Sequence, residues 1–246
     1  MSRYCFQFLL VLIGSLIITS PVLARDNIKL SAIYQAIHAE SLIRATDITL
    51  HGVIDIFAKQ KINEIDELII HETLNRYISR VPGLRAIIVT DTQGILRNDS
   101  FRYPTLNTNL KSRNYIKEAF GLDARELLIS PPLKNQFVNF ASLPISKPIF
   151  SLQGEIRGVV AGIMIPDQLL KRDKICKKCM VSIYKTSGEN LVTFPGQSQH
   201  RHDIKTLMRN NTANVQFPYK INGLDTDTIW VKIADFGLVL LYSRYK

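Results

Sequence analysis

Beyond residue 26 the chain carries apolar residues at the spacing of an α-helix. Ile33, Ile37 and Leu42, for example, recur three to five positions apart, and polar residues fill the other face. Residues 27–80 contain no proline and one glycine. The pattern therefore predicts one long helix within residues 25–82, ended by Val81-Pro82-Gly83. Such a helix is too long for a small core alone, so we expect it also to form a stalk or a dimer contact.

From residue 83 the pattern changes to short apolar segments separated by turns. Leu84–Thr90 predicts a strand, and Asp91-Thr92-Gln93-Gly94 predicts the turn after it, with Asp91 serving that turn. Ser112 is placed to cap a short helix over residues 113–120. Further strands are predicted over residues 127–129, 136–141, 143–150 and 155–165.

A second, smaller unit repeats this arrangement. Its predicted elements are strands over 181–184 and 190–194, a helix over 204–209, and strands over 215–219 and 228–243, the last interrupted near 235–237. The order of the elements predicts an α+β fold, in which a long N-terminal helix precedes two antiparallel sheets.

The first 24 residues have the pattern of a targeting segment. Arg3 precedes an apolar run from Phe6 to Thr19, and the small residues Val22 and Ala24 suit a cleavage site. A secretory signal peptide and an uncleaved membrane anchor both fit, because the stretch that ends at Ala24 is just long enough to span a bilayer. Either interpretation places the rest of the chain outside the cytoplasm. After cleavage of a signal peptide the protein would be periplasmic or secreted, and with an uncleaved segment it would be anchored and face the periplasm.

The chain of 246 residues is basic, with 31 Lys and Arg against 21 Asp and Glu, a formal net charge of +10. This excess suits an anionic small ligand, an anionic membrane surface or nucleic acid. The chain has no pattern of interleaved aromatic and basic residues, so we expect no nucleic-acid partner.

Cys176 and Cys179 are the two cysteines beyond the targeting segment, as Cys-Lys-Lys-Cys. In an oxidising compartment this spacing permits a local disulfide, whose small loop adds little stability. A redox pair activated by the flanking lysines is the functional alternative. A zinc site would need further ligands nearby, so we predict no metal.

The short motifs of common enzyme classes are absent from the sequence. It has no Gly-x-Ser-x-Gly elbow, His-Glu-x-x-His, phosphate-binding loop or dinucleotide fingerprint. We therefore expect neither an enzyme nor a bound cofactor.

Four segments, taken together in order and spacing, resemble the extracytoplasmic double Cache sensor domain, a PAS-like module of bacterial chemoreceptors, sensor kinases and diguanylate cyclases. They are residues 84–94 with the Asp-x-x-Gly turn, 111–116 with Arg113-Asn114-Tyr115, 128–132 (Leu-Ile-Ser-Pro-Pro), and 143–150 followed by 154–160. The resemblance implies a membrane-distal, ligand-binding PAS-like subdomain over residues 83–172. It implies a smaller, membrane-proximal one over residues 173–246.

The resemblance also implies a function in signal transduction: capture of a small, anionic, carboxylate-type metabolite. Relatives continue into a second transmembrane helix and an output domain, whereas this sequence stops at Lys246. We therefore expect it to act through a separate, membrane-bound signalling protein. The amino-acid-binding subgroup has a Trp within the Arg-x-Tyr segment that this chain lacks.

Four residues are the candidates for ligand binding. Arg113 would clasp a carboxylate, Tyr115 would form a wall, and Ser130 and Lys147 would add a hydroxyl and a positive charge. Without the resemblance, the same residues read as a surface cation, a core aromatic, the end of a strand and a solvated lysine.

The alternative function is a periplasmic protein-interaction or structural module with a degenerate pocket. In that case the long helix would be the contact surface, and it could pair two copies of the chain as a homodimer.

Overall fold

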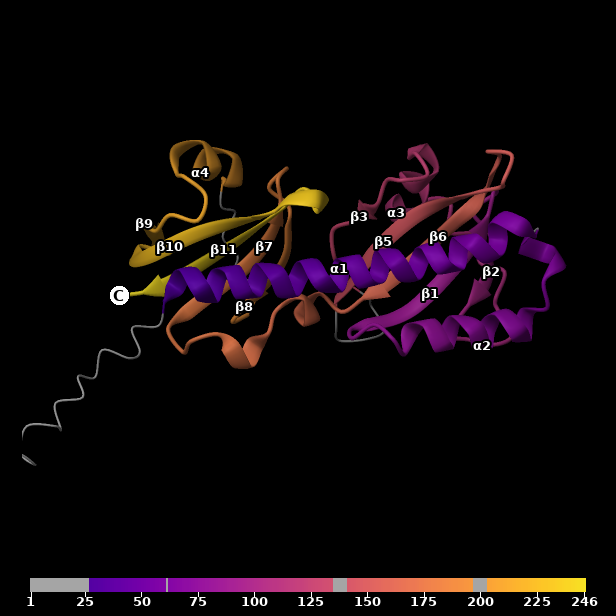
Figure 1. Cartoon of the computed structure of the whole chain (residues 1–246), viewed down its shortest axis with the longest axis horizontal. Coiled ribbons are helices and arrows are strands. Elements are labelled where there is room, and N and C mark those ends of the chain that lie inside the picture. Colours follow the sequence, from indigo (N-terminus) through magenta and orange to yellow (C-terminus); the bar gives the residue numbers. More distant parts are fainter. Residues whose placement is uncertain (1–26, 61, 135–140, 197–202) are drawn as a thin grey trace, which may run out of the picture.

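The computed structural model describes residues 27–60, 62–134, 141–196 and 203–246 of the chain. Helix α1 (Ile28–Lys59) runs past two antiparallel sheets that lie one after the other along it (Figure 1). This arrangement confirms the predicted α+β class, with a long helix and two sheets. The targeting segment at residues 1–24 lies outside the described residues.

Helix α1 begins at a side-chain cap and buries one face along its whole length. The side chain of Asn27 accepts hydrogen bonds from the backbone N–H groups of Lys29 and Leu30. Inward residues such as Ile43 and Leu50 are completely buried against the sheets. At about 1.5 Å per residue the 32-residue helix is about 48 Å long, enough to reach both sheets.

The prediction of one helix through residue 80 is wrong, because the chain turns after Lys59. Gln60 has an extended backbone, a short 3-10 turn follows (Ile62–Glu64), and helix α2 occupies Glu67–Ile78. The carboxylate of Asp66 caps α2 by accepting from the N–H groups of Leu68 and Ile69. The turn lets α2 fold back beside α1 (Figure 1), where it packs against the first sheet.

The first sheet has the strand order β2-β1-β6-β5-β3, and β4 also pairs with β5. All of its pairs are antiparallel. The strands are β1 (Leu84–Asp91), β2 (Leu96–Asp99), β3 (Leu128–Ile129), β4 (Leu133–Lys134), β5 (Ala141–Phe150) and β6 (Ile156–Met164). Most of the strand predicted over 136–141 lies outside the described residues.

Asp91 holds the turn between β1 and β2, as the sequence predicted. One carboxylate oxygen accepts from the N–H groups of Gln93 and Ile95, and the other accepts from the guanidinium of Arg97. Gly94 completes the turn with a φ of 75°, a conformation that favours glycine.

The second sheet has the order β8-β7-β11-β10-β9. Its strands are β7 (Cys179–Lys185), β8 (Asn190–Phe194), β9 (Phe217–Ile221), β10 (Leu224–Ile233) and β11 (Leu238–Tyr245). The predicted interruption near 235–237 is a 3-10 turn, Ala234–Phe236. Helix α4 (Ile204–Asn210) covers one face, and α1 covers the other (Figure 1).

Among the described residues, no helix combines the length and the apolar composition needed to cross a membrane.

Candidate functional site

The two faces of the first sheet carry different cores because neighbouring residues of a strand point to opposite faces. Ile87, Ile145 and Val160 belong to the large core that α1 and α2 cover. Ile88 and Ala161, which are opposite each other in the β1–β6 register, belong to a separate small core. The face with the small core therefore points away from α1.

A short helical segment covers this second face. Helix α3 (Asn114–Lys117) and the 3-10 turn Ala119–Gly121 contribute Tyr115, Ile116 and Ala119 to the small core. Leu128 of β3 packs against the same cluster. We call the sheet face beneath this segment the α3 face.

Two buried serine hydroxyls on the α3 face have no hydrogen-bond partner among the described residues. Ser146 of β5 is opposite Leu128 in the register, and the N–H of Ser130 continues the pairing by donating to the carbonyl of Pro144 over 3.0 Å. Strand alternation puts both side chains on the α3 face, as diagonal neighbours. Both hydroxyl oxygens are buried and unpartnered. Buried polar groups in proteins nearly always have partners, so two such groups side by side suit a site that a polar ligand completes.

Arg113 and Tyr115 are two residues apart but differ in backbone conformation and in burial. Arg113 is exposed and has an extended backbone at the cap position of α3, so the predicted cap Ser112 does not hold that position. Tyr115 is helical and buried. Burial raises the pKa of the Tyr115 hydroxyl, and the positive charge of Arg113 acts in the opposite direction. A cation and a phenol thus lie at the same edge of the small core.

The structure places Lys147, the fourth predicted residue, on the opposite face of the sheet. Its ammonium Nζ lies 2.8 Å from Oδ1 of Asp47 on α1 and 3.5 Å from the carbonyl of Arg125. The side chain is 0% exposed, so the expectation of a solvated lysine is wrong. The structure therefore brings Arg113, Tyr115 and Ser130 to one face and leaves Lys147 on the other.

The sequence pattern does not single out Ser146 or Asp47. Ser146 precedes Lys147 within a strand, and strand alternation alone places the two side chains on opposite faces. Asp47 gave no local signal, because it is a polar residue on a helix a hundred positions before its partner.

The structure joins Cys176 and Cys179 by a disulfide, with the two Cα atoms 5.1 Å apart. Within the described ranges, no three His, Cys, Asp or Glu side chains are grouped as a metal site would require.

Comparison with protein-family models gives no match, and neither does comparison with curated proteins. Solved structures do match. The extracellular domain of a protein assigned as the histidine kinase rpHK1S-Z16 aligns with a TM-score of 0.76 at 17% identity, over 89% of this chain and 92% of that one.

Two chemoreceptor domains align over a similar length. The ligand-binding domain of Campylobacter jejuni Tlp3, solved with L-norvaline, has a TM-score of 0.66 at 13% identity and covers 89% of each chain. That of Pseudomonas aeruginosa PctC, solved with GABA, has a TM-score of 0.62 at 15% identity and covers 87% of this chain and 96% of that one. The chain therefore has the fold of these extracellular sensor domains, and the Cache-type fold inferred from the sequence is confirmed.

Proposed function

We propose that this protein is an extracytoplasmic sensor module that binds a small carboxylate-bearing metabolite on the α3 face. The observation that carries the proposal is the pair of buried, unpartnered hydroxyls of Ser130 and Ser146. Leaving such groups unsatisfied is costly, whereas a ligand oxygen would accept or share their hydrogen bonds.

Arg113 supplies the charge that selects a carboxylate. A guanidinium holds a carboxylate through two parallel hydrogen bonds. The backbone of Arg113 is extended at the start of α3, which leaves its side chain free of the helix. Tyr115 would provide the wall beside it. The amino acids named with the two chemoreceptor structures carry carboxylates, which supports this class as the first to test.

A thermal-shift screen with carboxylates and amino acids tests the proposal, because a ligand that binds only the folded state raises the melting temperature. The same screen on Ser146→Ala, which removes one unpartnered hydroxyl, locates the site. Lys117→Ala, an exposed residue on the same short helix, is the matched control. We expect the control to keep the shift and Ser146→Ala to reduce it. If a carboxylate raised the melting temperature of Ser146→Ala and of Arg113→Ala by as much as that of the wild type, its binding site would lie elsewhere.

A second observation favours a protein partner that binds α1. The exposed positions of α1 from Leu30 to Asp55 are spaced alternately four and three residues apart, which is the repeat of a coiled-coil seam. Leu30, Ile37 and Ile48 on this line are 63%, 61% and 71% exposed. The line is completed by Tyr34, Ser41, Arg44, His51 and Asp55. We call it the α1 stripe.

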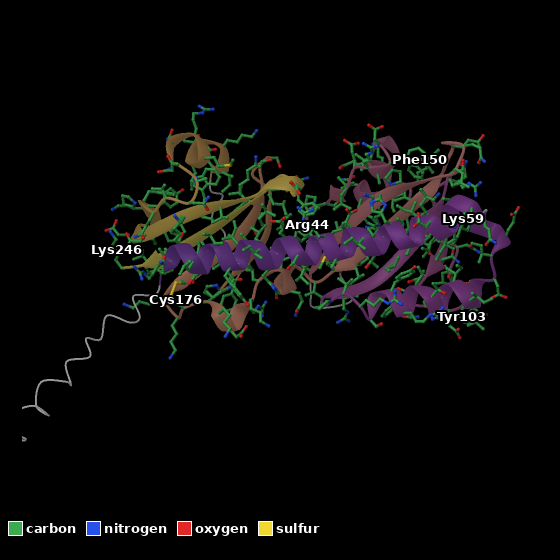
Figure 2. All side chains as sticks on the ribbon, in the orientation of Figure 1. Arg44, Lys59, Tyr103, Phe150, Cys176 and Lys246 are labelled. Carbon is green, nitrogen blue, oxygen red and sulfur yellow. A yellow bond between two sulfur atoms is a disulfide. The ribbon has the colours of Figure 1, made fainter. Side chains whose placement is uncertain are left out.

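We propose that the α1 stripe pairs two copies of the chain, or the chain and a membrane-bound signalling protein. Arg44, in the middle part of α1 (Figure 2), pairs with Glu40 and with Asp235 of the 3-10 turn between β10 and β11, and it lies over the ring of Phe236. Its charge is therefore partly compensated within its own chain, which reduces repulsion between two copies.

Cysteine cross-linking distinguishes the two partners. In a parallel homodimer, Ser41 of each copy faces its counterpart, so Ser41→Cys should cross-link on oxidation. Glu72→Cys, an exposed position on α2, is the control and should not. Adding Ile37→Asp and Ile48→Asp should abolish the cross-link. Monomeric Ser41→Cys protein at all concentrations would exclude the homodimer and leave a different partner for the stripe.

A further inference from the structure

The positive charge of the chain is concentrated in its last third. Residues 171–246 hold thirteen Lys and Arg against six Asp and Glu, whereas residues 27–170 hold sixteen against fourteen. The second sheet and the segment that leads into it therefore carry most of the excess of +10. The candidate ligand site lies in the other part, so this charge calls for a separate explanation.

Several of these cations meet at one end of the molecule. The N–H of Tyr245 donates to the carbonyl of Lys178 over 2.9 Å, and the N–H of Lys246 donates to that of Asp225 over 3.2 Å. The turn before β7, the end of β11 and the β9–β10 hairpin are thus neighbours. Cys176 and Lys246 both lie beside the start of α1 (Figure 2). We call this end, with its exposed Lys29, Lys177, Lys178, Lys220 and Lys246, the basic end.

Among the described residues, the aspartates of the basic end do not neutralise it. Asp225 pairs with Lys220 at 3.4 Å, and Asp227 is shared between Lys246 at 3.3 Å and Arg244 at 3.9 Å. Two carboxylates are thus paired with three cations. Within the described ranges, no ion pair involves Lys177 or Lys178. An uncompensated positive surface remains, and the two exposed lysines of the Cys176–Cys179 turn belong to it.

Exposed leucines accompany the lysines. Leu30 is 63% exposed in the first turn of α1, and Leu224 is 59% exposed directly after the hairpin turn of Asn222 and Gly223. Apolar side chains among cations are the composition of surfaces that enter the headgroup region of a bilayer. The predicted targeting segment ends at Ala24, three residues before the cap of α1. An extended chain of that length reaches only about 10 Å, so an anchor would hold this end close to the membrane.

We propose that the basic end docks on the surface of an anionic phospholipid bilayer. Each lysine near such a surface contributes about 1 kcal/mol, a factor of about five in partitioning, and the attraction falls off within about 10 Å at 0.1 M salt. Cations gathered at one end therefore orient the molecule, with α1 leading away from the bilayer and the first sheet far from it. The docking needs neither a ligand on the α3 face nor a partner on the α1 stripe.

Vesicle co-sedimentation tests the proposal with the chain from Arg25, which retains the helix cap at Asn27 and all of the described core. Vesicles of phosphatidylglycerol and phosphatidylcholine are compared with vesicles of phosphatidylcholine alone, which have phosphate groups but no net charge. We expect binding to the anionic vesicles only, and we expect it to weaken steeply as the salt concentration rises.

Two double variants with the same change in net charge distinguish binding through the basic end from attraction by the net charge of the whole protein. Lys177→Glu with Lys178→Glu should weaken partitioning by about 25-fold or more, from about fivefold for each lysine. Lys59→Glu with Lys111→Glu, both exposed and with Lys59 at the far end of α1 (Figure 2), should change it much less. Circular dichroism verifies that both variants are folded.

Three results would overturn the proposal: no binding to anionic vesicles at low salt, equal binding to uncharged vesicles, or the same loss in both double variants. The last would show that net charge, and not this surface, drives the attraction.

Discussion

Lys147 of strand β5 and Asp47 of helix α1 form an ion pair that joins the first sheet to the long helix. The ammonium donates to the carboxylate over 2.8 Å, and the lysine side chain is completely buried while that of Asp47 is 28% exposed. The two residues are a hundred positions apart in the chain. A buried ammonium is tolerated only with such a partner.

Removing the carboxylate should therefore cost more than removing the lysine. Asp47→Ala leaves a buried ammonium whose one remaining partner among the described residues is the carbonyl of Arg125 at 3.5 Å, and we expect a loss of about 2–4 kcal/mol in the free energy of unfolding. Lys147→Met replaces the charge by an apolar chain of similar length and should cost less than about 1.5 kcal/mol.

Denaturant unfolding measures both changes. Asp55→Ala, an exposed carboxylate on the same helix, is the control and should stay within about 0.5 kcal/mol of the wild type. If Lys147→Met were as destabilising as Asp47→Ala, the pair would stabilise the fold more than its desolvation costs, contrary to this expectation.

The fold was predictable from the sequence where the pattern is local. The strand over Leu84–Thr90 and the Asp91 turn were expected, because an apolar run followed by Asp-x-x-Gly has one common local solution. The break after Lys59 was missed, since Ile62 and Ile65 continue the helical spacing across it. The cap at Asp66 was the signal for a new helix.

The candidate site was less predictable, because it depends on which face of a strand each residue occupies. Arg113 and Tyr115 were proposed through the resemblance of one continuous segment. Lys147 was grouped with them although its ammonium binds α1, and Ser146, its neighbour, was missed. Strand alternation puts the side chains of Ser146 and Lys147 on opposite faces, but only the contacts of α1, such as the ion pair of Lys147 with Asp47, show which face α1 covers.

Gly158 of β6 should be intolerant of any side chain. A Cβ built at this position would lie 1.9 Å from the carbonyl oxygen of Thr90 on the neighbouring strand. The strands would have to separate, so we expect Gly158→Ala to destabilise the protein by about 3 kcal/mol or more. Gly121→Ala, where a Cβ meets nothing within 4 Å, should cost less than about 1 kcal/mol. Thermal and denaturant unfolding of the two variants give the comparison, and equal stabilities would contradict the close approach of the strands.

The Cys176–Cys179 disulfide should contribute little to stability. It closes a loop with a sequence separation of three, and the chain-entropy estimate for so short a loop is about 2 kcal/mol or less. The double variant Cys176→Ser, Cys179→Ser should unfold within that margin of the oxidised wild type, measured by denaturant titration. Reduction of the wild type should have the same effect. A loss of several kcal/mol would assign the bridge a structural role in holding β7.

Arg113 should set the affinity for a carboxylate ligand on the α3 face. If a carboxylate from the thermal screen binds there, Arg113→Ala removes a charge-assisted contact of roughly 1.5–3 kcal/mol, about a 10- to 150-fold loss of affinity. Arg113→Lys should restore only part of it, because an ammonium cannot form the planar two-bond contact. Tyr115→Phe should cost no more than one neutral hydrogen bond, about 1 kcal/mol.

Titration calorimetry with that carboxylate measures the three affinities. Lys117→Ala is the matched control, since Lys117 is also an exposed cation of the α3 segment and should change affinity by less than about twofold through its charge alone. Arg113 is exposed and its backbone holds the start of α3, so its substitution should leave the melting temperature of the ligand-free protein nearly unchanged. A folded Arg113→Ala protein with wild-type affinity would remove Arg113 from the site, and unchanged affinity in Ser146→Ala as well would remove the α3 face.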